Sequence, residues 1–126
     1  MAIENNFEII MVADANLTDE ESQAVFDKFR KLIKNLNGEI KFENSWGRRR
    51  LAYEINKKQF GIFQLLYVKG NGALVEEVER QFGYDEKILK FFIMAVDDLE
   101  KEYNDFEALK ADPNKNANLV KEAMGA

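Results

Sequence analysis

The spacing of the hydrophobic residues changes several times along this chain, and the order of these changes constrains the fold more than any other feature. Two segments, 18–37 and 73–82, repeat apolar residues every three or four positions, as amphipathic helices do. Four other segments show the alternation or the short apolar runs typical of strands: 7–13, 39–55, 62–69 and 88–96. The predicted order is strand, helix, strand, strand, helix, strand.

The first helix carries the clearest local signals. Thr18 and Glu21 have the spacing of a capping box, in which each side chain accepts a hydrogen bond from the backbone N–H of the other residue. Asn37-Gly38 supplies the left-handed position that commonly closes a helix. Between these signals runs one apolar stripe, which is predicted to face the core: Val25, Phe26, Phe29, Leu32, Ile33 and Leu36.

This element order fits two right-handed β-α-β units. The fold class is therefore predicted as α+β, a ferredoxin-like sandwich (βαββαβ) with a four-stranded antiparallel sheet and both helices on one face. Segment 88–96 is apolar on both faces except at Lys90, which favours an interior position in the sheet. Residues 1–99 are predicted as the domain and 100–126 as a tail, partly helical or mobile, whose removal leaves the fold intact.

Segment 39–55 needs an irregularity. Ile40 and Phe42 share one face of a strand, but Leu51 and Tyr53 have the opposite parity. A strand exchanges its faces only at a bulge or break, so one is expected within 44–47, with Gly47 its natural site. Tyr53 is then predicted to be a core residue.

The basic residues are concentrated in one part of an acidic chain. Segment 41–58 contains six Lys/Arg and two acids, whereas the other residues contain 12 basic and 21 acidic side chains. Such a cluster favours an anionic ligand, although a solvated turn would carry the same charges. Its candidate contact residues are Arg48, Arg49 and Arg50, with Lys57 and Lys58 at the tip of a predicted hairpin.

The composition excludes most catalytic chemistry. The chain has no Cys and no His, so thiolate metal sites, thiol nucleophiles and imidazole bases are all missing. An enzyme is not expected, nor is a cofactor or metal. The first residues lack the pattern of a signal peptide and no apolar run has the length of a membrane span, so we expect a cytoplasmic protein without membrane contact.

One stretch resembles a known family. Trp46-Gly47-Arg48-Arg49-Arg50-Leu51-Ala52-Tyr53, followed by Ile55, Lys57 and Phe63, is similar to the signature of the bacterial small-subunit ribosomal protein six family. Phe7-Glu8 stands where that family commonly has Tyr-Glu, and segment 88–93 resembles its last strand. The resemblance covers about residues 5 to 96 in the same order of elements. The sequence of the tail, 100–126, is its own.

The resemblance implies a cytoplasmic, ribosomal protein that binds small-subunit ribosomal RNA as a heterodimer with small-subunit ribosomal protein eighteen. The arginine run, Lys57, Lys58 and Lys90 would then contact RNA phosphates or acids of the partner. The alternative is a small-molecule-binding regulatory domain of the same fold, with the arginines holding an anionic metabolite. The Trp46 side chain could stack on a base or pack against the sheet, and packing is the commoner role of Trp.

Overall fold

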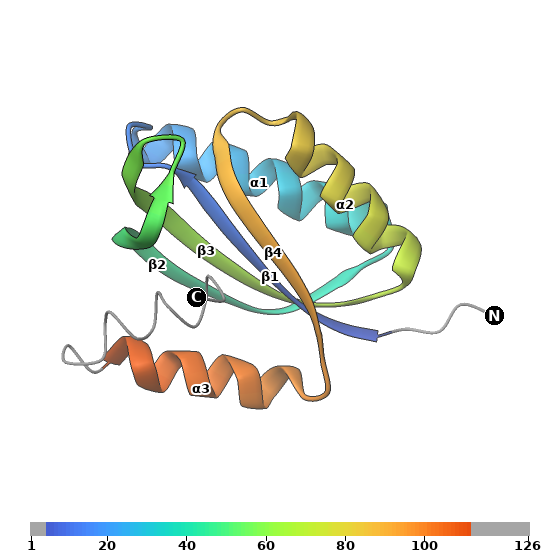
Figure 1. Cartoon of the computed structure of the whole chain (residues 1–126). Coiled ribbons are helices and arrows are strands. Elements are labelled where there is room, and N and C mark those ends of the chain that lie inside the picture. The colour runs from blue at the N-terminus through green and yellow to red at the C-terminus, as the bar shows by residue number, and fades with distance from the viewer. Residues whose placement is uncertain (1–4, 112–126) are drawn as a thin grey trace.

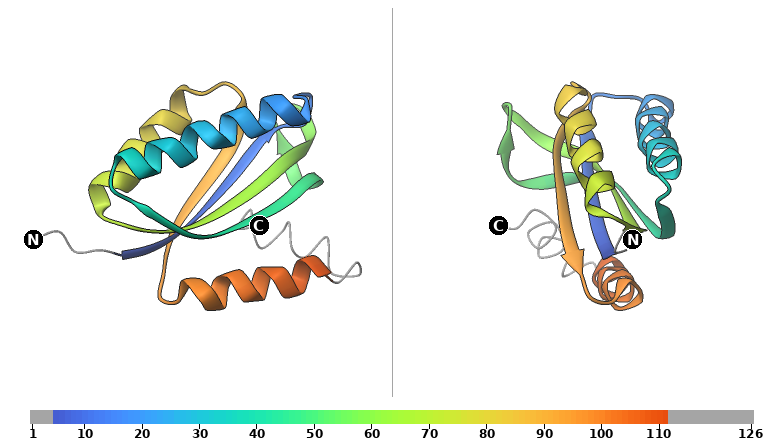
Figure 2. Two further views of the ribbon diagram at one scale, coloured as in Figure 1. Left: turned by 180° about the vertical axis from the view of Figure 1, so that it is seen from behind. Right: turned by 90° about the vertical axis from the view of Figure 1, so that its right-hand side faces the viewer.

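The computed structural model describes residues 5–111, and it confirms the predicted fold class. The seven elements follow in the order β1 (Asn5–Asp14), α1 (Asp19–Asn35), β2 (Glu39–Ile55), β3 (Lys58–Gly70), α2 (Gly72–Tyr84), β4 (Ile88–Val96) and α3 (Leu99–Ala111). The strands form one sheet in the order β2-β3-β1-β4 in which all pairs are antiparallel. Helices α1 and α2 lie together on one face of it, and α3 lies on the other (Figures 1 and 2).

The larger core lies between the sheet and the helix pair α1 and α2. Alternate residues of β1 point into it, and the ring of Phe29 from α1 packs on Phe82 from α2 with centroids 4.1 Å apart. The predicted capping box is present, with Glu21 N donating to Thr18 Oγ1 and Thr18 N donating to Glu21 Oε1. Asn37 has the expected positive φ, 64°. The predicted apolar stripe of α1 therefore faces this core.

A second core lies beneath the opposite face, where α3 packs. Leu99 is buried there, and Tyr103 stacks on Phe42 of β2 with ring centroids 4.9 Å apart. Asp98 caps α3 by accepting from Lys101 N. The helix thus begins at the boundary between the predicted domain and tail, and part of the predicted tail covers the sheet. Residues 112–126 lie outside the described range, and the division at 99/100 stays a prediction.

The predicted interior position of segment 88–96 is wrong, because β4 is an edge strand that pairs only with β1 among the described strands. Its residues are apolar on both faces for another reason. Phe91 and Ile93 pack against the core under α1 and α2, whereas Phe92 and Val96 pack against the core under α3. Apolar residues on both sides therefore reflect a sheet covered on both faces, and they carry no information on strand order.

The irregularity predicted at 44–47 of β2 is present. The pairing of β2 with β3 shifts between Ser45 and Gly47, and Gly47 has a φ of 73°, in the left-handed region that favours glycine. The prediction that Ile40 and Phe42 share a face is wrong, because the pairing also shifts between them and they pack against different cores. The prediction that Tyr53 is a core residue is wrong, since 43% of it is exposed. The pairing of β1 with β3 ends at Asp14 and Gly61, so Tyr53 lies on a two-stranded extension that has left the layered part of the molecule.

Candidate nucleic-acid interface

The predicted basic residues gather on the hairpin formed by β2 and β3. Its turn is Asn56-Lys57, where φ is 50° and 63°, and Ile55 pairs with Lys58. Two consecutive positive φ values are the mark of the tight turn whose twist matches that of the strands. Lys57 thus sits at the tip, and Lys58 is the first residue of β3. We call residues 46–60 the hairpin surface.

The three arginines alternate across β2. Arg48 and Arg50 are exposed, whereas Arg49 is half-buried on the side of the buried Leu51. The guanidinium of Arg48 lies over the ring of Phe60, 5.0 Å from its centroid. This cation–π contact holds the Arg48 side chain along the strand while its donors remain in water.

Arg49 is less exposed than Arg48 and Arg50. Its guanidinium lies 5.8 Å from the centroid of the Trp46 ring, and burial lowers the pKa of Arg49 below its ordinary value. Trp46 is itself buried and stacks on Phe63 with centroids 5.6 Å apart, which confirms that it packs against the sheet. The bulge at Gly47 therefore turns the indole inward and leaves one cation fixed above it.

Most of these cations have no acidic neighbour. Among residues 5–111, no carboxylate lies within salt-bridge distance of Arg48, Arg49, Arg50, Lys57 or Lys90, and Nε of Arg49 has no hydrogen-bond partner. Lys58 differs, since its Nζ lies 3.7 Å from Asp14 Oδ2. Elsewhere, Arg30 bridges Asp27 and Glu43. The hairpin surface thus carries positive charge that the rest of the described chain does not neutralise.

Lys90 lies apart from the other five predicted contact residues. It is exposed on β4 and pairs with Val12, which in turn pairs with Phe63 and so with Gly47. Three strand spacings separate its backbone from that of Gly47, about 14 Å. A ligand that contacts Lys90 together with the arginines must therefore cross the whole sheet.

Two exposed aromatic residues of the hairpin surface were not predicted. Tyr53 and Phe60 expose 43% and 40% of their surface. Strand parity predicts Tyr53 in the core, and Phe60 lies between the predicted strands 39–55 and 62–69. Their only sequence signal is their closeness to the turn, where strands run past the layers that would cover them.

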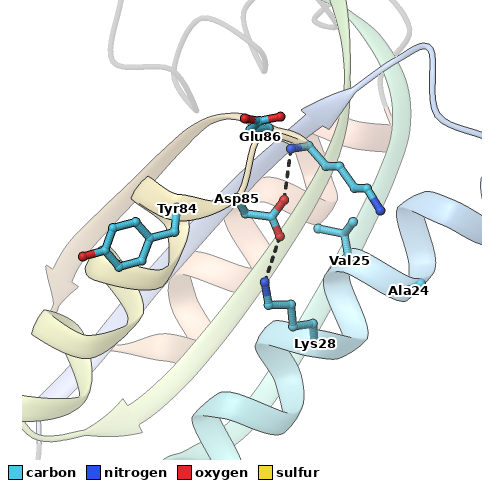
Figure 3. A pocket seen from close by; sticks show the side chains of 7 residues that line it. Ala24, Val25, Lys28, Tyr84, Asp85 and Glu86 are labelled. Carbon is cyan, nitrogen blue, oxygen red and sulfur yellow. Dashed lines mark hydrogen bonds and ion pairs between the residues drawn. The ribbon is translucent and has the colours of Figure 1, made fainter.

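The chain also has a pocket between α1 and the connection from α2 to β4 (Figure 3). Asp85 is already satisfied there: its Oδ2 lies 3.2 Å from Lys28 Nζ, and its Oδ1 accepts a hydrogen bond from the backbone N–H of Lys87. None of the six predicted contact residues lines it. Within the described range, no group of three acidic, His or Cys side chains could hold a metal ion, and no helix is long and apolar enough to cross a membrane.

Comparison with known families and structures gives one consistent result. The family model described as Ribosomal protein S6 matches residues 6–95. Small ribosomal subunit protein bS6 from Desulforapulum autotrophicum is 38% identical over 117 residues, which cover 93% of this chain and 73% of that protein. The bS6 protein from Parabacteroides distasonis is 33% identical over 99 residues, covering 79% of this chain and 84% of that protein.

A solved structure agrees on the fold. The crystal structure of 30S ribosomal protein S6 from Thermotoga maritima superimposes with a TM-score of 0.73 and 24% sequence identity. The match covers 83% of this chain and 99% of that one. At this level of identity the likeness concerns the fold alone.

Proposed function

The chain belongs to the ribosomal protein S6 family of the small ribosomal subunit, and we propose that it binds small-subunit ribosomal RNA there together with small-subunit ribosomal protein eighteen. Membership confirms the family resemblance, the ribosomal location in the cytoplasm and the prediction that the chain is not an enzyme. RNA contact, the partner and the contact residues are the proposal. The unneutralised charge of the hairpin surface is the observation that carries it.

The geometry assigns different tasks to the arginines. Arg48 and Arg50 are exposed on β2, and each carries a guanidinium fork that matches two phosphate oxygens. Arg49 is fixed by Trp46, so less conformational entropy is lost when it binds an anion. Phosphate contacts place a protein on RNA without reading the sequence, so specificity must come from RNA shape and from the joint surface with the partner.

The net charge explains why a partner is needed. The chain carries a formal charge of −5, and the residues outside segment 41–58 contain 21 acidic but only 12 basic side chains. Long-range repulsion then opposes the approach of RNA to the free protein. A basic partner beside the hairpin surface would extend its positive charge and offset the repulsion from the rest of the chain. The exposed rings of Tyr53 and Phe60 offer it apolar contact area next to the arginines.

A salt titration of complex formation tests the proposal. Wild type and the double variant Arg48→Glu/Arg50→Glu are each mixed with the partner protein, and RNA affinity is measured across salt concentrations. Each lost phosphate contact should flatten the log–log salt dependence by roughly 0.7 to 0.9. Lys31→Glu/Lys34→Glu on α1 is the matched control, because it changes the charge equally at two exposed positions outside the hairpin surface.

The outcomes separate the two roles of the surface. Equal affinities and slopes for wild type and the arginine variant would exclude phosphate contact by Arg48 and Arg50. If both charge variants weaken binding equally, the effect is one of net charge and the site assignment is wrong. If the arginine variant fails to form the heterodimer before RNA is added, the arginines contact the partner protein.

A further inference from the structure

A carboxyl group is buried beneath α3 without a counterion. Glu8 lies in β1, an inner strand of the sheet, and only 1% of it is exposed. Its Oε1 has no hydrogen-bond partner. Directly opposite on β3 stands Tyr67, which is fully buried and whose hydroxyl also lacks a partner. An ionised carboxylate in such a place loses its hydration, and its Oε1 gains no hydrogen bond in return.

Helix α3 lies across this face of the sheet (Figures 1 and 2), and its Tyr103 packs in the same core as Tyr67. The ring of Tyr103 meets Tyr67 edge-on, with centroids 5.8 Å apart, and also stacks on Phe42. The turn into the helix is fastened to β1, since Asn6 Nδ2 donates to the carbonyl of Asp97. Helix α3 spans only 13 residues, a length at which a helix is marginal in water without tertiary contacts.

The charged groups around Glu8 oppose its ionisation. Burial, followed by the charge of Glu102 on α3, raises the pKa of Glu8 to about 7. Glu107 of α3 likewise acts on Tyr67, the neighbour of Glu8 on β3, whose pKa is raised mainly by burial. On β4 the residue opposite Glu8 is Met94, and on β2 the nearby aromatic is Phe42.

No described base compensates for these acids. Among the described side chains, none lowers the pKa of Glu8. Lys69 on β3 acts instead on Glu39, and Lys101 of α3 pairs with Asp105. The docking of α3 on the sheet thus brings the acid Glu102 close to the acid Glu8.

We propose that α3 is a proton-controlled cover: it docks on the sheet while Glu8 is protonated, and loss of that proton releases the helix and uncovers Glu8, Tyr67 and Phe42. Release hydrates the carboxylate at the cost of the contacts between α3 and the sheet, among them those of Tyr103 and Leu99. The core between the sheet and α1 and α2 stays closed, because its residues lie on the opposite face.

The direction of the pH effect follows from the two states. With α3 released, Glu8 has an ordinary pKa near 4.5, and with α3 docked it is about 7. Below pH 4.5 both states are protonated and docking is strongest. Docking weakens as the pH rises from 4.5 to 7, because only the released state gives up its proton, and it levels off above 7. The full change in the ratio of docked to released protein is on the order of a few hundred-fold.

Hydrogen exchange of the backbone amides of α3, measured on the full chain between pH 5 and 8, tests the proposal. Rates are corrected for the intrinsic pH dependence of exchange and compared with amides of β1 and β3 in the same sample. The protection of α3 should fall relative to that of the strands as the pH rises to 7, and then level off. A ratio independent of pH in the wild type overturns the proposal.

Two variants identify the group responsible. Glu8→Gln keeps the shape of the side chain and cannot ionise, so α3 should remain protected throughout. Glu102→Gln removes the repelling charge and should move the transition to lower pH without abolishing it. An unchanged profile in Glu8→Gln overturns the proposal. If that variant does not fold, the Glu102→Gln profile decides, and an unshifted transition there also contradicts the proposal.

Discussion

The indole of Trp46 stacks on the ring of Phe63, with planes inclined by 20° and centroids 5.6 Å apart, so the most basic part of the chain rests on a buried aromatic pair. Trp46 therefore has a structural task even though it stands beside three arginines. It anchors the bulged part of β2 to β3, and its outer side supports Arg49.

Replacing Trp46 with Ala should destabilise the protein by about 3–5 kcal/mol, because it removes a large buried ring and leaves a cavity beside Phe63. Urea unfolding followed by circular dichroism measures this cost, since the variant loses the only Trp of the chain and with it the fluorescence signal. An unchanged midpoint accompanied by weaker RNA binding would instead assign Trp46 to base stacking.

Replacing Tyr53 with Ala should change stability by less than about 1 kcal/mol, because the ring lies on the exposed two-stranded extension. Leu51→Ala, two residues earlier on the same strand, is the control and should cost about 2–5 kcal/mol, since Leu51 is buried. Equal losses of stability in the two variants would show that Tyr53 is a core residue. Weaker binding of the partner or RNA by Tyr53→Ala is expected if the hairpin surface is the interface.

Gly61→Ala should destabilise the sheet by about 1–3 kcal/mol, as overpacking in a core commonly does. A Cβ there would lie 2.5 Å from Cγ1 of Val12, a stiff side chain that is fully buried. Gly83→Ala in α2 provides the control. No atom would lie within 4 Å of its Cβ, and helix propensity favours Ala. Thermal unfolding should therefore separate the two variants in opposite directions.

Deleting residues 100–126 should leave a cooperative fold, because the sheet and the core under α1 and α2 are complete without them. The truncated protein should nevertheless be less stable, by about 1–3 kcal/mol, since Phe42 and Tyr67 lose the cover of Tyr103. Far-UV circular dichroism and urea unfolding provide the check. Loss of the cooperative transition would make α3 part of the domain, and an unchanged midpoint would mean that its packing contributes little.

Local patterns in the sequence were sufficient for the element order. The capping box of α1, the stripe containing Phe26 and Phe29, and the parity change at Gly47 are set by neighbouring residues, so each could be read from a short window and each is present in the structure. The basic cluster was visible in the same way. A short connection between two strands implies an antiparallel hairpin, so the sequence also predicted that Lys57 lies at its tip.

Tertiary structure decided which faces are covered, since that depends on segments far apart in the chain. Parity in the sequence predicted one face for Tyr53 and Leu51, but Leu51 is buried whereas Tyr53, beyond the end of β1 at Asp14, is exposed. The sequence by itself determined that β4 is apolar on both sides, but the packing of α3 under the sheet supplied the reason. Glu8 could be read as one more acid in an acidic chain, and only burial beneath α3 makes it a group that titrates near neutral pH. Periodicity records how a strand alternates, whereas the energy of each side chain depends on what lies above it.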